Sequence, residues 1–247
     1  MIRTKQVFWA LVILIALWQA VAMVAQIAIL PTPVSVFNAT LVGLCHDLPA
    51  HFLASLWRVV ASTFLAIIFA APLGLILGQS KKLNQLLAPV IYILYPIPKV
   101  VLLPVVLLFF GIGNFSKIFI IFLILFFQIL VLVRDQANTL RPELIQSVRS
   151  LGAGRRALFR YVYLPASLPA ILTALRQSIG TAVAVLYVAE LFATQKGLGY
   201  YIYLNGSTLF NYPAMYAGIV AMSVLGFGLY FVVDWLERIL CPWQNVK

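Results

Sequence analysis

Long apolar stretches alternate with short polar segments along the whole chain. Six of these stretches are long enough to cross the ~30 Å hydrocarbon core of a bilayer as a helix. They lie near residues 7–30, 53–78, 85–110, 115–133, 166–192 and 213–236. None shows the strict alternation of apolar and polar positions that a membrane barrel strand requires. The pattern therefore predicts an all-α membrane protein with about six transmembrane helices.

Composition supports this prediction and removes two alternatives. Only 9% of the residues are charged and 64% are hydrophobic, whereas soluble domains carry about 25% charged residues. The net charge of +11 could indicate nucleic-acid binding, but no soluble segment is present that would carry a basic face. The first apolar run extends from about Val7 to Leu30, which exceeds the ~7–15 residues of a signal peptide's apolar region. We interpret it as a retained transmembrane helix.

The distribution of lysine and arginine predicts the orientation. If the N-terminus is cytoplasmic, only Lys117 and Lys196 fall in external segments, and Arg58, Lys99 and Arg176 fall within spans. The other 12 of the 17 basic residues are then cytoplasmic, as the positive-inside rule requires. They are Arg3, Lys5, Lys81, Lys82, Arg134, Arg141, Arg149, Arg155, Arg156, Arg160, Arg238 and Lys247. We therefore expect both termini in the cytoplasm, with Cys45 outside and Cys241 inside, where the two cannot pair.

The longest internal loop, about 134–165, contains the basic stretch "SVRSLGAGRRALFRYVYLPASLP". We expect two short helices here, Glu143–Leu151 and Arg155–Leu164, with a change of direction at Gly152–Gly154. Leu158, Tyr161 and Val162 share one face of the second helix. Pro165 and Pro169 then either lie in the first turns of the next span or separate it from the loop. The residues alone leave two functions open, an interfacial helix on anionic lipid and a docking surface for a soluble partner.

Several spans contain residues that are costly at membrane depth. Pro96, Pro98 and Pro104 disturb the third span, and such a helix persists only inside protein or beside a wet cavity. The candidates for a translocation path or a buried network are Pro96, Pro98, Lys99, Arg176, Glu190 and Arg58. Of these, Lys99 and Arg176 lie deepest, and two cations at depth would suit an anionic solute. Arg58 and Glu190 lie nearer the external ends of their spans, where they can snorkel or pair with each other. Gly74 and Gly78 have the spacing that permits close helix packing, although it also arises by chance.

The run "SLGAGRRALFRYVYLPASLPAILTALRQSIG" resembles the cytoplasmic loop and following helix of permease subunits from bacterial ABC importers. The family pattern is Glu-Ala-Ala, three residues, Gly, nine residues, Ile, one residue and Leu-Pro. Gly152 supplies the glycine, Val162 stands for Ile, and Leu164-Pro165 closes the pattern. Gln146, Ser147 and Val148 occupy the Glu-Ala-Ala positions, which is a departure. The stretches "SLWRVVAS", "YPIPKVVLLPVVLLFFGIG", "ALRQSIGTAVAVLYVAEL" and "GLGYYI" are similar to permeases of the nitrate, sulfonate, taurine and pyrimidine-precursor group.

This resemblance, which covers about 52–240, implies a type I ABC importer (MetI-like) permease fold in the bacterial inner membrane. It implies a homodimer that forms the path, two cytoplasmic ATP-binding subunits and an external solute-binding protein. The loop would couple the ATPase to the spans through Gln146, Ser147, Val148, Leu151, Gly152, Ala153, Gly154, Arg155, Arg156, Leu164 and Pro165. The sequence has no G-x-x-x-x-G-K-[ST] motif, so ATP and Mg are expected on the partner ATPase and no cofactor is expected in this chain. The chain itself is therefore not expected to be an enzyme.

The expected organisation is an N-terminal helix with an external loop (1–52) followed by a permease core (53–240). The main alternative is a secondary transporter driven by an ion gradient, which would more often show an internal repeat and acidic residues at mid-membrane. No clear repeat is visible, and Glu190 is the only carboxylate well inside an apolar run. A membrane-embedded enzyme is disfavoured because the only histidines, His46 and His51, lie in the first external loop without a carboxylate cluster.

Overall fold

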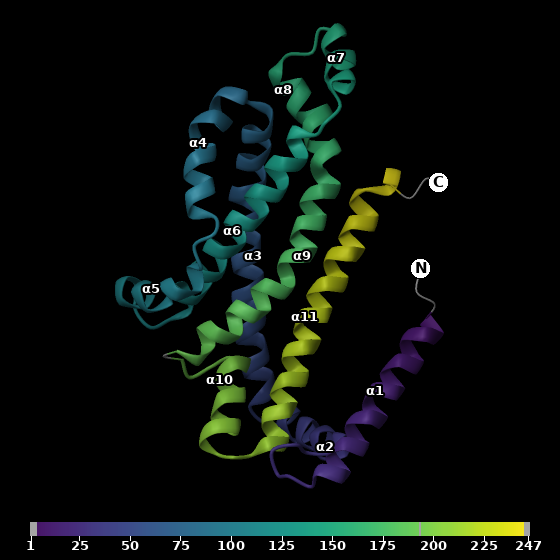
Figure 1. The fold of residues 1–247 in the computed structure, drawn as a ribbon, viewed down its shortest axis with the longest axis vertical. Helices are drawn as coiled ribbons and strands as arrows, with labels where there is room; N and C mark the ends of the chain where they lie inside the picture. The colour runs from purple at the N-terminus through teal and green to yellow at the C-terminus, as the bar shows by residue number, and fades with distance from the viewer. Residues whose placement is uncertain (1–3, 193, 245–247) are drawn as a thin grey trace. The chain divides into compact units, whose positions relative to one another are not determined.

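The computed structural model describes residues 4–192 and 194–244 and is built from helices throughout this part of the chain (Figure 1). The long helices are α1 (Thr4–Ala25), α3 (Leu48–Gln79), α6 (Asn114–Asn138), α9 (Leu164–Leu191) and α11 (Tyr212–Leu240). The shorter ones are α2 (Pro33–Leu44), α4 (Lys81–Leu94), α5 (Leu103–Phe110), α7 (Pro142–Ser150), α8 (Arg155–Leu158) and α10 (Leu198–Tyr203). Short 3₁₀ turns span Lys99–Leu102 and Pro242–Gln244, and π-helical turns span Phe159–Tyr163 and Leu204–Thr208.

The all-α membrane fold is confirmed. Four described helices, α3, α6, α9 and α11, are long and apolar enough to cross a bilayer, and α4 with the helical segment 99–110 makes a fifth if that bent pair is one span. The pair bends by 74°, where the sequence predicts one disturbed helix over 85–110. The described apolar part of α1, Trp9–Ala25, is shorter than the other spans. Of the six expected spans, the first, near residues 7–30, is therefore the one that helix length supports least.

The chain divides into two compact units. One contains residues 1–55 and 190–224, and the other contains residues 56–189 and 225–247. The expected division into 1–52 and 53–240 stays a prediction.

In the second unit, α3 packs directly on α6 through two glycines. A Cβ on Gly74 would lie 2.9 Å from the Leu130 carbonyl oxygen, and one on Gly78 would lie 2.4 Å from the Ala137 Cβ. These distances leave no room for a side chain, so the Gly74–Gly78 spacing marks a packing face and is not a chance match. The face of α6 that meets α3 is buried.

The same unit holds an apolar cluster between α9 and α11. Leu172, Leu175 and Ile179 of α9 pack with Val233 of α11 and with Cys241, which follows α11. Cys241 is 1% exposed, so the residue that directly follows α11 packs against the spans by an apolar contact. Burial and the nearby Glu237 raise the pKa of the Cys241 thiol.

In the first unit, two helices occupy segments that the sequence treats as external loops. The helix α2 begins with Thr32 as its N-cap, whose hydroxyl accepts from the Ser35 N–H, and with Pro33 in its first turn. The Trp18 indole of α1 donates to the Pro31 carbonyl and stacks on Tyr216. Helix α10 follows Gly197, whose φ of +136° is accessible mainly to glycine.

Candidate functional site

The basic loop folds as a projecting pair of short helices, α7 and α8, beyond the ends of α6 and α9 (Figure 1). The expected turn lies at Gly152, which has a φ of +80° and donates its N–H to the Arg149 carbonyl. This value of φ is accessible mainly to glycine, and no atom lies within 4 Å of where a Cβ on Gly152 would be. The turn at Gly152 is therefore an exposed protrusion with free space around it, which we call the Gly152 knob.

The second loop helix differs from the expectation in one respect. It ends at Leu158, continues as a π-helical turn over Phe159–Tyr163 and runs into α9 without a break. Pro165 lies in the first turn of α9 and Pro169 within it, so the prolines do not separate loop from span. Leu158 and Val162 are buried, but Tyr161, which the sequence predicts to share their face, is 69% exposed. The wider π-turn changes the register and rotates Tyr161 outward.

The surface of the helix pair is mixed. Gln146, Ser147 and Arg156 are exposed, Ala153 and Val148 are half-buried, and Leu151 is 85% exposed at the tip. The backbone of Arg155 is described, but its side chain lies outside the described set. Beside the pair lies an apolar cavity of about 280 Å³, lined by Leu144, Val148, Tyr161, Val162, Pro165, Ala166 and Trp243. The loop thus presents apolar side chains on an otherwise polar projection.

Lys99 occupies the bend between α4 and α5, and its ammonium group is used within the chain. Its Nζ donates to the carbonyls of Leu94, Tyr95 and Ile97 at 2.9, 2.9 and 3.3 Å. Residue 98 is a proline, so the Leu94 carbonyl has no i+4 N–H partner. Lys99 replaces that missing donor, and the Phe127 ring lies 4.5 Å from Nζ. Lys99, which the sequence predicts as a cation at membrane depth, therefore caps the free carbonyl groups where the helix breaks after α4.

Arg176 is likewise engaged, with acids that the sequence analysis did not assign to it. Its Nη1 lies 3.0 Å from Asp234 Oδ1 and 3.1 Å from Glu237 Oε2, both on α11. Asp234 also pairs with Arg238 at 2.8 Å. Two cations and two carboxylates thus balance, which places Arg176 in an α9–α11 ion network. The hydrophobic periodicity of α9 does not indicate which residues of another helix pair with Arg176, so these acids, about 60 residues away, could not be assigned from the sequence.

Arg58 and Glu190 are buried, contrary to the expectation that they snorkel. Arg58 Nε donates to Asn114 Oδ1 at 2.9 Å. Glu190 accepts from Ser55 Oγ at 2.8 and 2.9 Å and from the Gly199 N–H at 2.8 Å. The expected pairing of Arg58 with Glu190 stays a prediction.

Glu190 belongs to a clamp on the start of α10. Ser55 Oγ accepts from the Leu198 N–H at 2.8 Å, and His51 Nδ1 accepts from the Gly197 N–H at 3.0 Å. Three consecutive backbone donors at the beginning of α10 are thereby bound by side chains of α3 and α9. The clamp fixes the segment that leaves α9, and its members are up to 146 residues apart.

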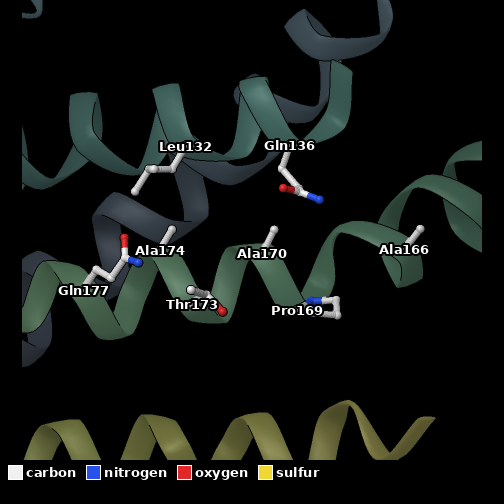
Figure 2. A pocket seen from close by; sticks show the side chains of 8 residues that line it. All are labelled: Leu132, Gln136, Ala166, Pro169, Ala170, Thr173, Ala174 and Gln177. Atoms are coloured by element: carbon white, nitrogen blue, oxygen red, sulfur yellow. The ribbon is translucent and has the colours of Figure 1, made fainter. Parts of the chain in front are cut away.

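An open groove of about 340 Å³ runs between α6 and α9. Figure 2 shows Leu132 and Gln136 pointing from α6 toward α9, while Ala170, Ala174 and the Gln177 amide point back toward α6. Ala166, Pro169 and Thr173 complete the lining. A second cavity of about 370 Å³ lies at the bend and is lined by Tyr95, Ile97, Pro98, Lys99, Val100, Ile124, Phe127, Gln128 and Val185. Pro96 does not line either cavity.

Comparison with known proteins identifies the family to which this arrangement belongs. Residues 70–243 match the model of the binding-protein-dependent transport system inner membrane component. The chain belongs to this family. It is a permease, as the resemblance predicted, and the secondary-transporter alternative is wrong.

Curated relatives span nearly the whole permease. It is 33% identical to the taurine transport system permease protein TauC of Escherichia coli over 95% of this chain and 88% of that protein. It is 30% identical to the putative aliphatic sulfonates transport permease protein SsuC of Bacillus subtilis over 94% of this chain and 85% of that protein. The formylaminopyrimidine transport permease protein ThiX of Halalkalibacterium halodurans is 29% identical over 94% of this chain and 93% of that protein.

The solved structure of the MetNI methionine ABC transporter, in an inward-facing conformation, shares the fold of this permease. The two chains superpose with a TM-score of 0.68 at 20% identity, over 78% of this chain and 95% of that chain. The type I importer fold is therefore confirmed.

Proposed function

We propose that two copies of this permease form the import path for a small sulfonate-type solute, with ATP hydrolysed by two separate cytoplasmic subunits. An external binding protein delivers the cargo, and both termini of the permease face the cytoplasm. The observation that carries the cargo proposal is the 33% identity to a taurine permease along 95% of the chain. The aliphatic sulfonate relative supports the same class of solute.

The ATPase docks on the α7–α8 pair. This assignment is supported by the projecting geometry of the pair and by Leu144 and Leu151, which are 49% and 85% exposed. Exposed apolar side chains on a polar projection mark a protein-binding surface. The Gly152 knob, directly after Leu151, adds a defined shape to this surface. ATP and Mg bind to that partner.

Assembly as a homodimer is supported by the open side of the α6–α9 groove, where polar amides lie at span depth. Polar side chains in a span face protein or water, because hydrocarbon offers no hydrogen-bond partner. A second copy facing this groove would enclose it and leave a path at the subunit interface. The homodimer also follows the resemblance to two-copy importers.

The test is reconstitution of the permease with its ATPase and binding protein in proteoliposomes. Taurine and an aliphatic sulfonate should be taken up only with ATP, and a protonophore should leave uptake unchanged. Riboflavin and a formylaminopyrimidine serve as competing cargo probes. Uptake without the ATPase would overturn the energy source, and preference for either competing probe would overturn the sulfonate assignment. Mass measurement of the purified complex should give two permease chains, and one chain would refute the homodimer.

A further inference from the structure

Two rows of residues connect the cavities between α6 and α9. On α6, Ile124 and Gln128 line the cavity at the bend, and the next residues at spacing four, Leu132 and Gln136, line the open groove. Residues four apart lie above one another on a helix. The two cavities therefore follow one face of α6.

The facing row on α9 has the same period. Thr173 and Gln177 line the open groove, and Val185, eight residues further, lines the cavity at the bend. We name the surface formed by these two rows the α6–α9 seam. Its hydrogen-bonding side chains within the cavities include Gln128, Gln136 and Gln177, and about 12 Å of helix separates the first two at 1.5 Å per residue.

The depth of these amides indicates what the seam faces. Gln177 lies 13 residues after the first residue of α9 and 14 before the last, at the midpoint of the helix. Gln128 is the fifteenth of the 25 residues of α6. Gln177 is exposed in the single chain and Gln128 is half-buried. An amide without a partner is disfavoured in hydrocarbon, so this side of the seam faces water or protein.

The cations that would attract an anion have their hydrogen bonds committed elsewhere. The Lys99 ammonium donates to three backbone carbonyls, and Arg176 is paired with two carboxylates of α11. A glutamine amide offers two N–H donors without charge. Neutral donors bind more weakly than charged ones, which suits a path because a solute must leave each position as readily as it enters.

We propose that the α6–α9 seam is the solute track of the permease, and that Gln136, Gln177 and Gln128 bind the oxyanion group in successive positions. The inference rests on the proposed function, because it assumes that an anionic solute crosses this chain. It adds the residues that contact the solute and assigns the recognition to neutral amides.

The experiment uses the full complex of permease, ATPase and binding protein, in a background with Cys45→Ser and Cys241→Ala. A single cysteine replaces Gln177, and a second variant replaces Ser223, an exposed residue of α11 that lines neither cavity. A membrane-impermeant hydrophilic thiol reagent is added to open membranes, with and without millimolar taurine. We expect the cysteine at 177 to react and taurine to slow its reaction, whereas the cysteine at 223 should show no protection.

Transport gives the second measurement. Gln177→Leu and Gln128→Leu remove the amide donors at similar volume, and each should lower taurine uptake roughly tenfold, the value of one hydrogen bond of about 1.4 kcal/mol. Ser223→Leu, at a residue that lines neither cavity, should transport taurine and hydrolyse ATP like the unmodified permease.

The seam proposal and the cargo proposal fail in different ways. If the unmodified permease takes up no sulfonate, the cargo assignment is wrong, and accessibility of the cysteine at 177 still shows whether the seam is wet. A cysteine at 177 that never reacts would mean a dry seam and would overturn the solute track. Reaction without protection, together with normal uptake by Gln177→Leu, would also overturn it.

Discussion

Replacing Lys99 by methionine tests whether this cation acts as a helix cap or as an anion site. Methionine keeps the length of the side chain but removes the three donors to Leu94, Tyr95 and Ile97. Two of these bonds are 2.9 Å long, and bonds to a charged group contribute about 1.5–3 kcal/mol each. Lys99 is 8% exposed, so the three carbonyl oxygens would be left largely without a replacement donor. We expect a loss of about 3 kcal/mol in the free energy of unfolding.

The loss should appear as a lower melting temperature of the purified permease in detergent. At about 2–4 °C per kcal/mol for a chain of this size, Lys99→Met should melt about 6–12 °C earlier. Lys82→Met, on the exposed surface of α4, is the matched control and should change the free energy by no more than about 0.5 kcal/mol. Adding Pro98→Ala to Lys99→Met restores an N–H four residues after Leu94, and it should recover part of the loss.

The anion-site reading gives a different result. Lys99→Met would then melt like the unmodified permease, while the KM for taurine would rise and the KM for an uncharged cargo would not. Such a split would refute the helix-cap account. A drop in melting temperature without recovery by Pro98→Ala would leave the cap intact for Tyr95 and Ile97 but refute the role assigned to Pro98.

Four further outcomes are expected. Ser55→Ala removes the hydroxyl that links Glu190 to the Leu198 N–H and should lower the melting temperature by about 4–8 °C for a loss of about 2 kcal/mol, whereas Ser150→Ala at an exposed site should not. Gly152→Asp forces a side chain into a φ of +80° at a cost of about 1–2 kcal/mol and should abolish ATPase copurification and uptake. Gly154→Asp and Arg156→Gln change an exposed charge and should retain ATPase copurification and uptake, because exposed charges contribute little. If these two variants fail while Gly152→Asp behaves like the unmodified permease, the loop works through its charge. Single cysteines at Asn38 and Gln195, but not at Ser150, should react with an impermeant reagent applied outside sealed cells; reaction at Ser150 would overturn the orientation. Cys241 should alkylate much more slowly than exposed Cys45 at pH 8, because its raised pKa lowers the thiolate fraction, and equal rates would contradict its burial.

The sequence predicts the membrane class, most of the long helices and the loop pair, because these depend on local apolar length and on glycine and proline signals. The turn at Gly152 and the packing face at Gly74 and Gly78 follow from the same kind of local pattern. The helix α2 was missed, although Thr32 and Pro33 are a recognisable helix start. At 12 residues, α2 is too short to span a bilayer, and its segment was therefore assigned to an external loop.

The contacts of the charged residues could not be predicted in the same way. Glu190 meets Ser55 across 135 positions of sequence, and Arg176 meets Asp234 across 58. Such pairs depend on which faces of two helices meet. The hydrophobic periodicity of a single sequence indicates the buried face of each helix, but not the helix that this face contacts. The bend cap at Lys99 is the exception, because its acceptors lie two to five residues away. A proline at residue 98 leaves the Leu94 carbonyl without a donor, and the lysine beside it is the nearest replacement.

These contacts change how polarity in the spans relates to transport. A charge at span depth is costly unless it is paired, and Lys99, Arg176 and Glu190 each have partners within the chain. Such groups hold helices in place, and releasing them for a passing solute would break the structure that they stabilise. A glutamine amide has a smaller desolvation cost, so it can face a wet groove without a permanent partner. Groups that must exchange partners during each transport cycle are therefore better sought among the neutral side chains of α6 and α9 than among the cations.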